Sequence, residues 1–115
     1  MHPYKRSKRV SDLLREEIAL IVMRRIKDPR LGFVTITAVE TTEDLKLARV
    51  YISVFDKATT DQTLEILNAA RGFIRGELSR SVKMKYIPQL EFFRDKSIEY
   101  GERIDNLLDE IKGDG

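Results

Sequence analysis

Two helical patterns meet at Asn68-Ala69-Ala70-Arg71-Gly72-Phe73-Ile74-Arg75-Gly76, the segment on which the fold prediction depends. Apolar residues at helical spacing enter and leave it, at Leu64, Leu67, Ile74, Leu78 and Val82. A glycine inside a helix costs about 1 kcal/mol relative to alanine. Gly72 and Gly76 therefore indicate either a kink between two helices or a close approach of backbone to a ligand. Arg71 and Arg75 lie one turn apart, which favours a phosphate-bearing ligand.

The residues before this segment predict one helix and two strands. An apolar stripe of period 3.6 predicts a helix over 7–27, which ends at Asp28 because the next residue is proline. β-branched residues then predict strands over 33–40 and 45–55, and their short connection makes them antiparallel. Alternation predicts the residues on the buried face, which are Val34, Ile36 and Ala38, then Ala48, Val50, Ile52 and Val54.

The residues after the loop at 56–60 predict two helices, a third strand and a tail. Thr60 or Asp61 is expected to cap a helix that runs to Ala70. After the kink a second helix extends to about Met84, a short strand covers 90–94, and the last helix covers 97–111. The order α-β-β-α-α-β predicts a single α+β domain over 1–115, in which the helices cover one face of a three-stranded sheet. The core is predicted to contain Val10, Leu14, Ile18, Ile21, Val34, Ile36, Val50, Ile52, Leu67, Ile74, Leu78 and Phe92.

Composition bounds the function. The chain has 115 residues, 42% of them hydrophobic and none of them cysteine, and no run of 18 apolar residues that would predict a membrane span. The start of the chain has no apolar signal region, so a cytoplasmic protein is expected. The net charge of +2 is uneven, because the residues from Glu99 onward carry −4 and the rest carry +6. A basic body with an acidic tail (about 97–115) favours a nucleic-acid binder over a protein with ordinary surface charge.

No catalytic, metal-binding or cofactor motif is apparent. The only histidine is His2, close to the start of the chain, and no cysteine can partner it. The acidic pairs Glu16-Glu17 and Glu43-Asp44 are interpreted as solvated charge. No phosphate-binding loop or nucleophile elbow is present. The sequence therefore predicts a protein that is not an enzyme, with no cofactor and no metal.

Basic residues are the stronger indication of function, and they form three clusters. The first precedes and opens the first helix, where it opposes the helix dipole, and comprises Lys5, Arg6, Lys8 and Arg9. A secondary basic patch, which the helix dipole partly explains, comprises Arg24, Arg25, Lys27 and Arg30. The third follows the kink and comprises Arg71, Arg75, Arg80, Lys83 and Lys85, with Ala70 and Gly72 beside Arg71. The residues of the first and third clusters, with Ala70 and Gly72, are the predicted RNA-binding residues. Arg71, Arg75 and Lys83 share a stripe at intervals of four, and ion pairs with Glu65 or Glu77 are the alternative role for some of these arginines.

Two aromatic residues, Tyr51 and Phe93, are directed by strand alternation to the less buried face of the sheet. Exposed aromatic residues on a sheet can stack on bases. Cross-strand pairing, or packing under the C-terminal helix, is the favoured interpretation.

The predicted order is that of a type II KH domain, but Ala70-Arg71-Gly72 stands where KH domains have a GXXG loop. A helix–kink–helix fits this segment better than an open loop. With Ala70-Arg71-Gly72 and Ile26-Lys27-Asp28-Pro29-Arg30-Leu31-Gly32 together, the chain resembles the ribosome-binding factor A family over nearly its whole length. Further matching segments are Asp44-Leu45, Ala48-Arg49-Val50-Tyr51-Ile52-Ser53, Pro88-Gln89-Leu90-Glu91-Phe92 and Arg103-Ile104-Asp105.

The resemblance implies a bacterial, non-catalytic factor of ribosome biogenesis. It implies binding to the free 30S subunit, rather than the 70S ribosome, and to 16S rRNA during maturation. It also implies rRNA processing, cold adaptation and a cytoplasmic monomer without membrane contact. The alternative, consistent with the missing GXXG loop, is a protein–protein adaptor on a KH-like scaffold that does not bind RNA directly.

Overall fold

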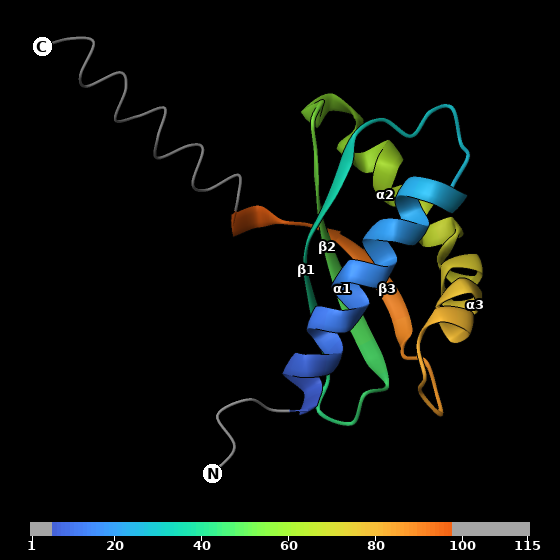
Figure 1. The fold of residues 1–115 in the computed structure, drawn as a ribbon. Helices are drawn as coiled ribbons and strands as arrows, with labels where there is room; N and C mark the ends of the chain where they lie inside the picture. The colour runs from blue at the N-terminus through green and yellow to red at the C-terminus, as the bar shows by residue number, and fades with distance from the viewer. Residues whose placement is uncertain (1–5, 98–115) are drawn as a thin grey trace, which may run out of the picture.

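The order of elements in the computed structural model, which describes residues 6–97, confirms the prediction α-β-β-α-α-β. Figure 1 shows these elements, which are α1 (Arg6–Arg25), β1 (Val34–Thr41), β2 (Leu47–Val54), the 3-10 turn η1 (Lys57–Thr59), α2 (Thr60–Ala69), α3 (Arg71–Ser81) and β3 (Gln89–Arg94). The predicted helix at 97–111 and the predicted RNA-binding residue Lys5 lie outside the described residues.

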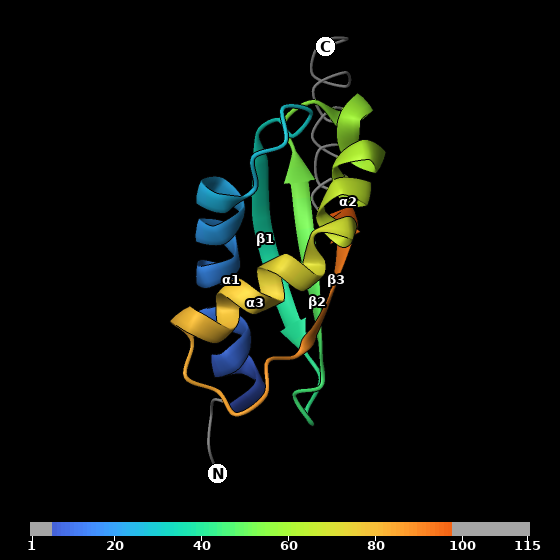
Figure 2. The ribbon, with the colours of Figure 1, turned by 90° about the vertical axis from the view of Figure 1, so that its right-hand side faces the viewer.

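The sheet has the order β1-β2-β3. β1 and β2 are antiparallel, as predicted, and β3 lies parallel to β2 on its other side. Figure 2 looks onto the helices, with α1 and α2 at the two sides and α3 between them, all in front of the sheet. The helices of residues 6–97 therefore cover one face of the sheet, and the other face, here called the open face, carries none of them.

The two strands of the hairpin differ in how well alternation predicts their faces. In β2 the residues Ala48, Val50, Ile52 and Val54 are all buried, as predicted. In β1 the prediction for Ala38 was wrong, because the register shifts between Ile36 and Ala38. This bulge places one extra residue in β1 and changes the phase of the strand. Val39 is buried in the core instead, opposite Val50.

The core lies between the helical layer and the sheet. Ten of the twelve predicted core residues are buried, and Val10 and Val34 are partly buried against the same cluster. Leu90 of β3 also joins it, and Ile87 brings the loop after α3 onto the core. No helix within residues 6–97 is both long and apolar enough to span a membrane.

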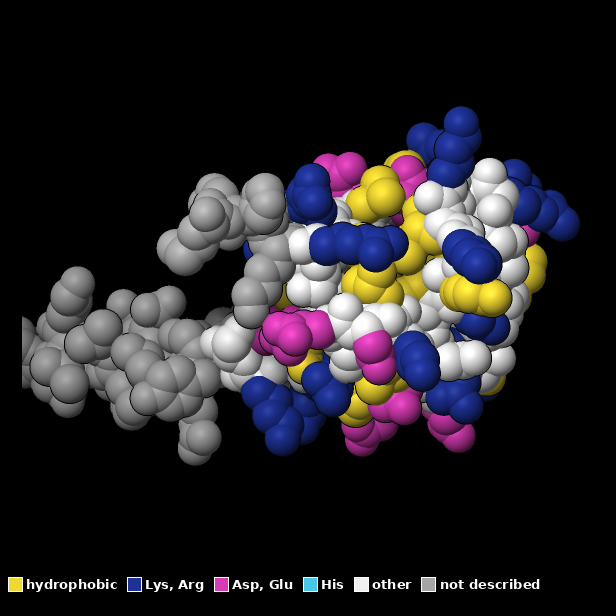
Figure 3. Space-filling view, turned by 90° about the horizontal axis from the view of Figure 1, so that it is seen from below, with side chains coloured by type: hydrophobic (Ala, Val, Ile, Leu, Met, Phe, Trp, Pro, Cys, Tyr) yellow, Lys and Arg dark blue, Asp and Glu magenta, His cyan; other side chains and the backbone are white. Residues whose placement is uncertain are grey.

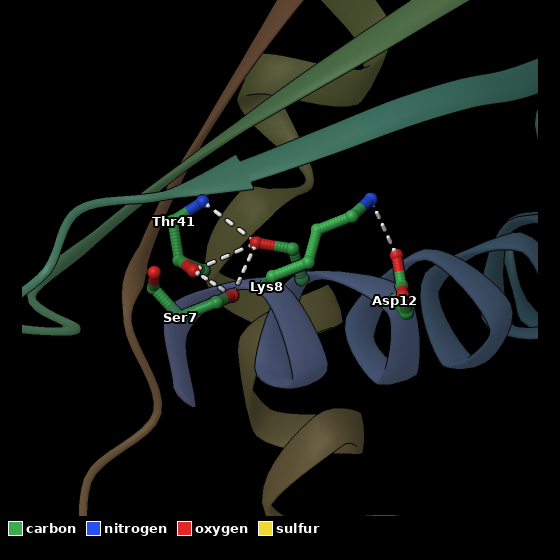
Figure 4. Close-up of polar contacts among 5 residues, drawn as sticks. Ser7, Lys8, Asp12 and Thr41 are labelled. Carbon is green, nitrogen blue, oxygen red and sulfur yellow. Dashed lines mark hydrogen bonds and ion pairs between the residues drawn. The ribbon is translucent and has the colours of Figure 1, made fainter. Parts of the chain in front are cut away.

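A small polar network attaches the start of α1 to the end of β1 (Figure 4). The hydroxyl of the buried Ser11 donates to the carbonyl of Ser7 at 2.7 Å and lies 2.8 Å from the hydroxyl of Thr41. The Thr41 hydroxyl also bonds the Ser7 carbonyl, and the Thr41 amide donates to Ser11 at 3.0 Å. The basic start of α1 is thereby fixed relative to the sheet.

Three predicted helix boundaries need correction. α1 ends at Arg25 rather than Lys27, and α3 ends at Ser81 rather than Met84. Neither Thr60 nor Asp61 caps α2, because Thr60 is already helical and its N-cap, Thr59, makes no side-chain capping bond. Asp56 supplies the cap one element earlier, where its carboxylate accepts from the Ala58 amide at the start of η1.

Candidate nucleic-acid interface

The junction between α2 and α3 is a kink at one residue, Ala70. Its backbone has φ −90° and ψ 2°, outside the helical range, and the helical hydrogen bonds continue on both sides of it. The Ala70 amide donates to the carbonyls of Ile66 and Leu67 at 3.0 and 3.1 Å, and the Ala70 carbonyl accepts from Ile74 at 2.9 Å. This arrangement confirms the predicted helix–kink–helix and leaves no room for a GXXG loop.

Gly72 does not form the kink, although a role there was predicted. It is the second residue of α3, and no glycine within residues 6–97 has a positive φ. A Cβ added at Gly72 or at Gly76 would meet no atom within 4 Å. The two glycines therefore leave a bare, open strip of backbone along the exposed side of α3.

Arg75 has an internal role that the sequence did not predict. Its Nε and Nη2 donate to the carbonyl of Ile87 at 3.0 and 2.7 Å, and Nε also lies 3.2 Å from the carbonyl of Pro88. Both accepting residues are buried. Arg75 thus attaches α3 to the loop 82–88, and its guanidinium is only partly available to a ligand.

A groove of about 750 Å³ runs between α3 and this loop. Its lining comprises Asn68, Ala69, Arg71, Gly72, Arg75, Gly76, Ser79, Met84, Lys85, Tyr86, Ile87, Gln89 and Leu90. The bare strip at Gly72 and Gly76 forms part of one wall, and Lys85 and the exposed ring of Tyr86 stand on the other. The ammonium group of Lys85 lies 5.6 Å from the centre of that ring.

A second groove, of about 540 Å³, lies on the other side of the same loop. It brings Arg6 from α1 and Lys46 from the β1–β2 turn together with Arg75 and Lys85. Two of the predicted basic clusters, distant in sequence, therefore meet across the loop. Figure 3, the view from below, shows Lys and Arg side chains around exposed apolar side chains at this end of the molecule, with some Asp and Glu side chains among them.

The predicted residues of these clusters differ in their partners. Arg71, Lys83 and Arg9 are exposed and form no ion pair within the described part of the chain. Lys8 pairs with Asp12 at 3.0 Å along α1. Lys83 follows the end of α3, so the predicted stripe of Arg71, Arg75 and Lys83 does not form on one helix.

The secondary basic patch lies at the opposite end of α1, and acids accompany it. Arg25 lies 3.9 Å from one carboxylate oxygen of Glu77. Arg80, of the third cluster, lies 3.9 Å from the other oxygen, which is the alternative that the sequence left open for that cluster. The guanidinium of Arg30 contacts the carboxylate of Asp28 at 2.8 and 3.1 Å. These hydrogen bonds hold the pKa of Asp28 below its ordinary value and raise the pKa of Arg30. Arg24 and Lys27 complete the patch as exposed side chains.

Two polar residues near the grooves were not predicted. Lys46 lies in a turn whose conformation depends on Leu45, the only non-glycine residue with positive φ within residues 6–97. Asn68 pairs with the outer edge of β3: its side chain donates to the Phe92 carbonyl at 3.2 Å and accepts from the Phe92 amide at 2.9 Å. A lone lysine in a turn and an asparagine in a helix carry no sequence signal for either role.

Tyr51 and Phe93 form the predicted cross-strand pair. They are direct partners in the register of β2 and β3, and their ring centres are 6.0 Å apart. Packing under a C-terminal helix concerns residues outside 6–97.

The fold and the kinked helix pair define a small α+β domain of the KH-like class, in which the kink replaces the GXXG loop. A family model described as "Ribosome-binding factor A" matches residues 6–108. The chain is 52% identical over 112 residues to ribosome-binding factor A of Thermodesulfovibrio yellowstonii, which covers 97% of this chain and 95% of that protein. The chain belongs to the ribosome-binding factor A family.

Solved structures of the same family are similar in fold. The crystal structure of ribosome-binding factor A from Thermus thermophilus gives a TM-score of 0.71 at 27% identity and covers 76% of this chain and 93% of its own. A Thermus thermophilus homology model fitted into the cryo-EM map of a 30S complex gives a TM-score of 0.65 at 28% identity, covering 75% and 91%.

Proposed function

We propose that this chain is a non-catalytic assembly factor that binds the free 30S subunit through 16S rRNA during maturation. Membership of the ribosome-binding factor A family supports the ribosomal target, and the relative fitted into a 30S map supports the subunit. Participation in rRNA processing and cold adaptation, a bacterial cytoplasmic location and a monomeric state belong to the same proposal.

The observation that carries the proposal is the convergence of basic side chains on the loop 82–88. Arg71 and Lys85 line one groove beside it, and Arg6, Lys46 and Lys85 line the other. Backbone without side chains at Gly72 and Gly76 lets a phosphate approach α3 closely. Phosphate contacts from Lys and Arg supply most of the sequence-independent affinity for nucleic acid. In this proposal the rRNA backbone lies along α3 and crosses the loop toward the start of α1.

The secondary basic patch has a smaller role in this proposal. Acids lie beside Arg25 and Arg30, so fewer of its charges are available to phosphate. The protein–protein adaptor remains the alternative function. It predicts binding to the subunit with little dependence on salt, because few condensed counterions would be released.

The test is 30S binding by cosedimentation across a salt series. Arg71→Ala with Lys85→Ala is expected to weaken binding and to reduce the slope of log affinity against log salt by about one to two units. The matched control removes the same charge from the other end of α1 through Arg24→Ala with Lys27→Ala, and should change the slope less. Wild-type slope in the first variant, with unfolding unchanged, would exclude the groove as the RNA site.

A further inference from the structure

Four aromatic residues are assigned to the open face of the sheet, which no helix of residues 6–97 covers. Tyr51 and Phe93 are one pair of rings. Phe33 and Phe55 lie opposite each other at the end of the hairpin, with the Thr35–Ser53 pair between them and Tyr51. The Phe55 amide donates to the Phe33 carbonyl at 3.1 Å, so the ladder continues past Val34 and Val54. Because Val54 is buried, alternation directs Phe55 to the open face. The exposed fractions are 79% for Phe33, 89% for Phe55 and 37% for Phe93.

A groove of about 550 Å³ occupies the middle of this face. Its lining comprises Ala38, Glu40, Arg49, Tyr51, Phe93, Arg94, Asp95, Lys96 and Ser97. The bulge in β1 contributes to it, because Ala38 faces Tyr51 rather than the core. Three cations and two acids line a partly apolar floor, a composition that fits an amphipathic segment with acidic flanks.

The chain itself leaves the sheet on this face. The Asp95 amide still bonds the Ile52 carbonyl at 2.9 Å, but its carboxylate accepts from the hydroxyl of Thr37 on β1, across β2. The other oxygen of that carboxylate accepts from the amide and the hydroxyl of Ser97, at 3.0 and 2.6 Å. Residues 96 and 97 are helical, so a carboxylate at position 95 that accepts from the Ser97 amide is in the position of a helix N-cap. Asp95 therefore starts a helical turn and ties it to the open face.

The remaining 18 residues, 98–115, match this face in pattern, charge and length. Apolar residues recur at i, i+3, i+4 and i+7, at Ile104, Leu107, Leu108 and Ile111. The segment carries −4, opposite in sign to Arg49, Arg94 and Lys96. A helix of that length would span about 27 Å, and the eight residues of β2 span about 26 Å.

We infer that residues 98–115 pack as an amphipathic helix across the open face, with the apolar stripe on the aromatic residues and the acids toward the flanking cations. The chain would then have a covered sheet face and an exposed pair of grooves at the loop 82–88. A single-stranded RNA or a second copy of the chain are the other occupants that an aromatic sheet face could take.

The absence of native cysteine allows a spin label at one introduced site of the full chain, Asp109→Cys, on the polar side of the segment. The expected result is loss of amide NMR signal at Tyr51, Ser53 and Phe93, with signals of Leu14 and Leu78 in the helical layer retained. Adding Leu107→Ser with Leu108→Ser should restore the open-face signals. The matched control Glu102→Ser, on the polar side, should leave them weakened.

Three results would overturn the inference. The first is full signal at the open face of the folded, labelled chain. The second is loss of signal on an unlabelled, isotope-enriched chain mixed with labelled chain, which would make a second copy the occupant. In the third, the open-face amides keep full signal in the labelled chain, and the amide signals of Tyr51 and Phe93 change position when single-stranded RNA is added. RNA would then be the occupant.

Discussion

The two ends of α1 both carry clustered arginines and lysines, yet the structure uses them differently. At the end where α1 starts, cations from α1, α3 and two turns line grooves beside the loop 82–88, and Arg71 forms no ion pair within residues 6–97. At the other end, Arg25 lies beside Glu77 and Arg30 binds Asp28. Asp44 also lines the second groove, but its carboxylate accepts from the Thr42 hydroxyl and the Lys46 amide. If the grooves bind phosphate, as proposed above, the position of acids in the fold, rather than the number of cations in the sequence, decides which cations are available to it.

The largest expected effect is a loss of stability when Arg75, which bonds the carbonyls of buried residues at the groove, is replaced. Arg75→Ala removes three hydrogen bonds to the carbonyls of Ile87 and Pro88, and bonds from a charged donor contribute about 1.5–3 kcal/mol. We expect a loss of that size in the free energy of unfolding, measured by urea denaturation. Arg75→Lys should recover only part of it, because an ammonium group cannot bond both carbonyls in the same geometry.

The control for Arg75 comes from the opposite end of α1. Arg25→Ala removes an exposed contact with Glu77 at 3.9 Å and should change stability by less than about 1 kcal/mol. Equal losses for the two variants would contradict the distinction between the two ends.

Local pattern was enough to predict the order of elements, the kink and the buried face of β2. Each depends on residues close in sequence: a glycine-interrupted helical stripe, a proline stop and a strict alternation. The bulge in β1 was not predictable, because the groups that contact Thr37 beside it are distant in sequence. The Thr37 hydroxyl bonds the Tyr51 carbonyl on β2 and the Asp95 carboxylate after β3. The same limit applies to Gly72, whose backbone is helical although its position in the sequence indicated the kink.

The candidate site was predictable only in part. Clusters that contain Arg71, Lys85 and Arg6 were visible as charge, but their meeting across the loop 82–88 depends on tertiary packing. The role of Arg75 could not be predicted because its acceptors are backbone carbonyls. Every residue has a carbonyl, so the sequence does not indicate which ones an arginine will bond. Spacing of four residues on a helix could not separate Arg75 from Arg71, although one has buried partners and the other is exposed.

A second prediction concerns what holds the start of α1. Ser11→Ala removes the acceptor of the Thr41 amide and the contact between the two hydroxyls. A buried donor left without a partner costs about 1–3 kcal/mol, and we expect a loss of about 1–2 kcal/mol in unfolding experiments. Ser79→Ala is the control, since that hydroxyl is exposed and bonds only within α3, to Gly76. If the two serines gave the same small effect, the network would not anchor this end of the helix.

The third prediction is a gain in stability rather than a loss. Gly72 is helical and a Cβ there would meet no atom, so Gly72→Ala should raise the free energy of unfolding by up to about 1 kcal/mol. The same methyl group would stand on the wall of the larger groove, so binding to 30S should weaken in a cosedimentation assay. Stabilisation with unchanged binding would move the RNA contact away from α3, while destabilisation would contradict the helical conformation.

The smallest expected effect is a pH dependence of stability that arises from Asp28, at the other end of α1. Hydrogen bonds from the Arg30 guanidinium hold the folded-state pKa of Asp28 below its ordinary value of 3.8. A lowered pKa means that the ionised carboxylate stabilises the fold above the ordinary value, and that this contribution disappears as the pH falls through the lowered one. In the wild type the Arg30 amide donates to Oδ1 of Asp28 at 2.9 Å. Asp28→Asn retains a side-chain oxygen for this amide but removes the charge. The difference in melting temperature between wild type and Asp28→Asn should therefore be small at pH 7 and should shrink as the pH is lowered below 3.8. A difference that is constant from neutral to acid pH would mean that the turn, rather than the ion pair, accounts for the role of Asp28, and the neutralised character of this end would then rest on Glu77 alone.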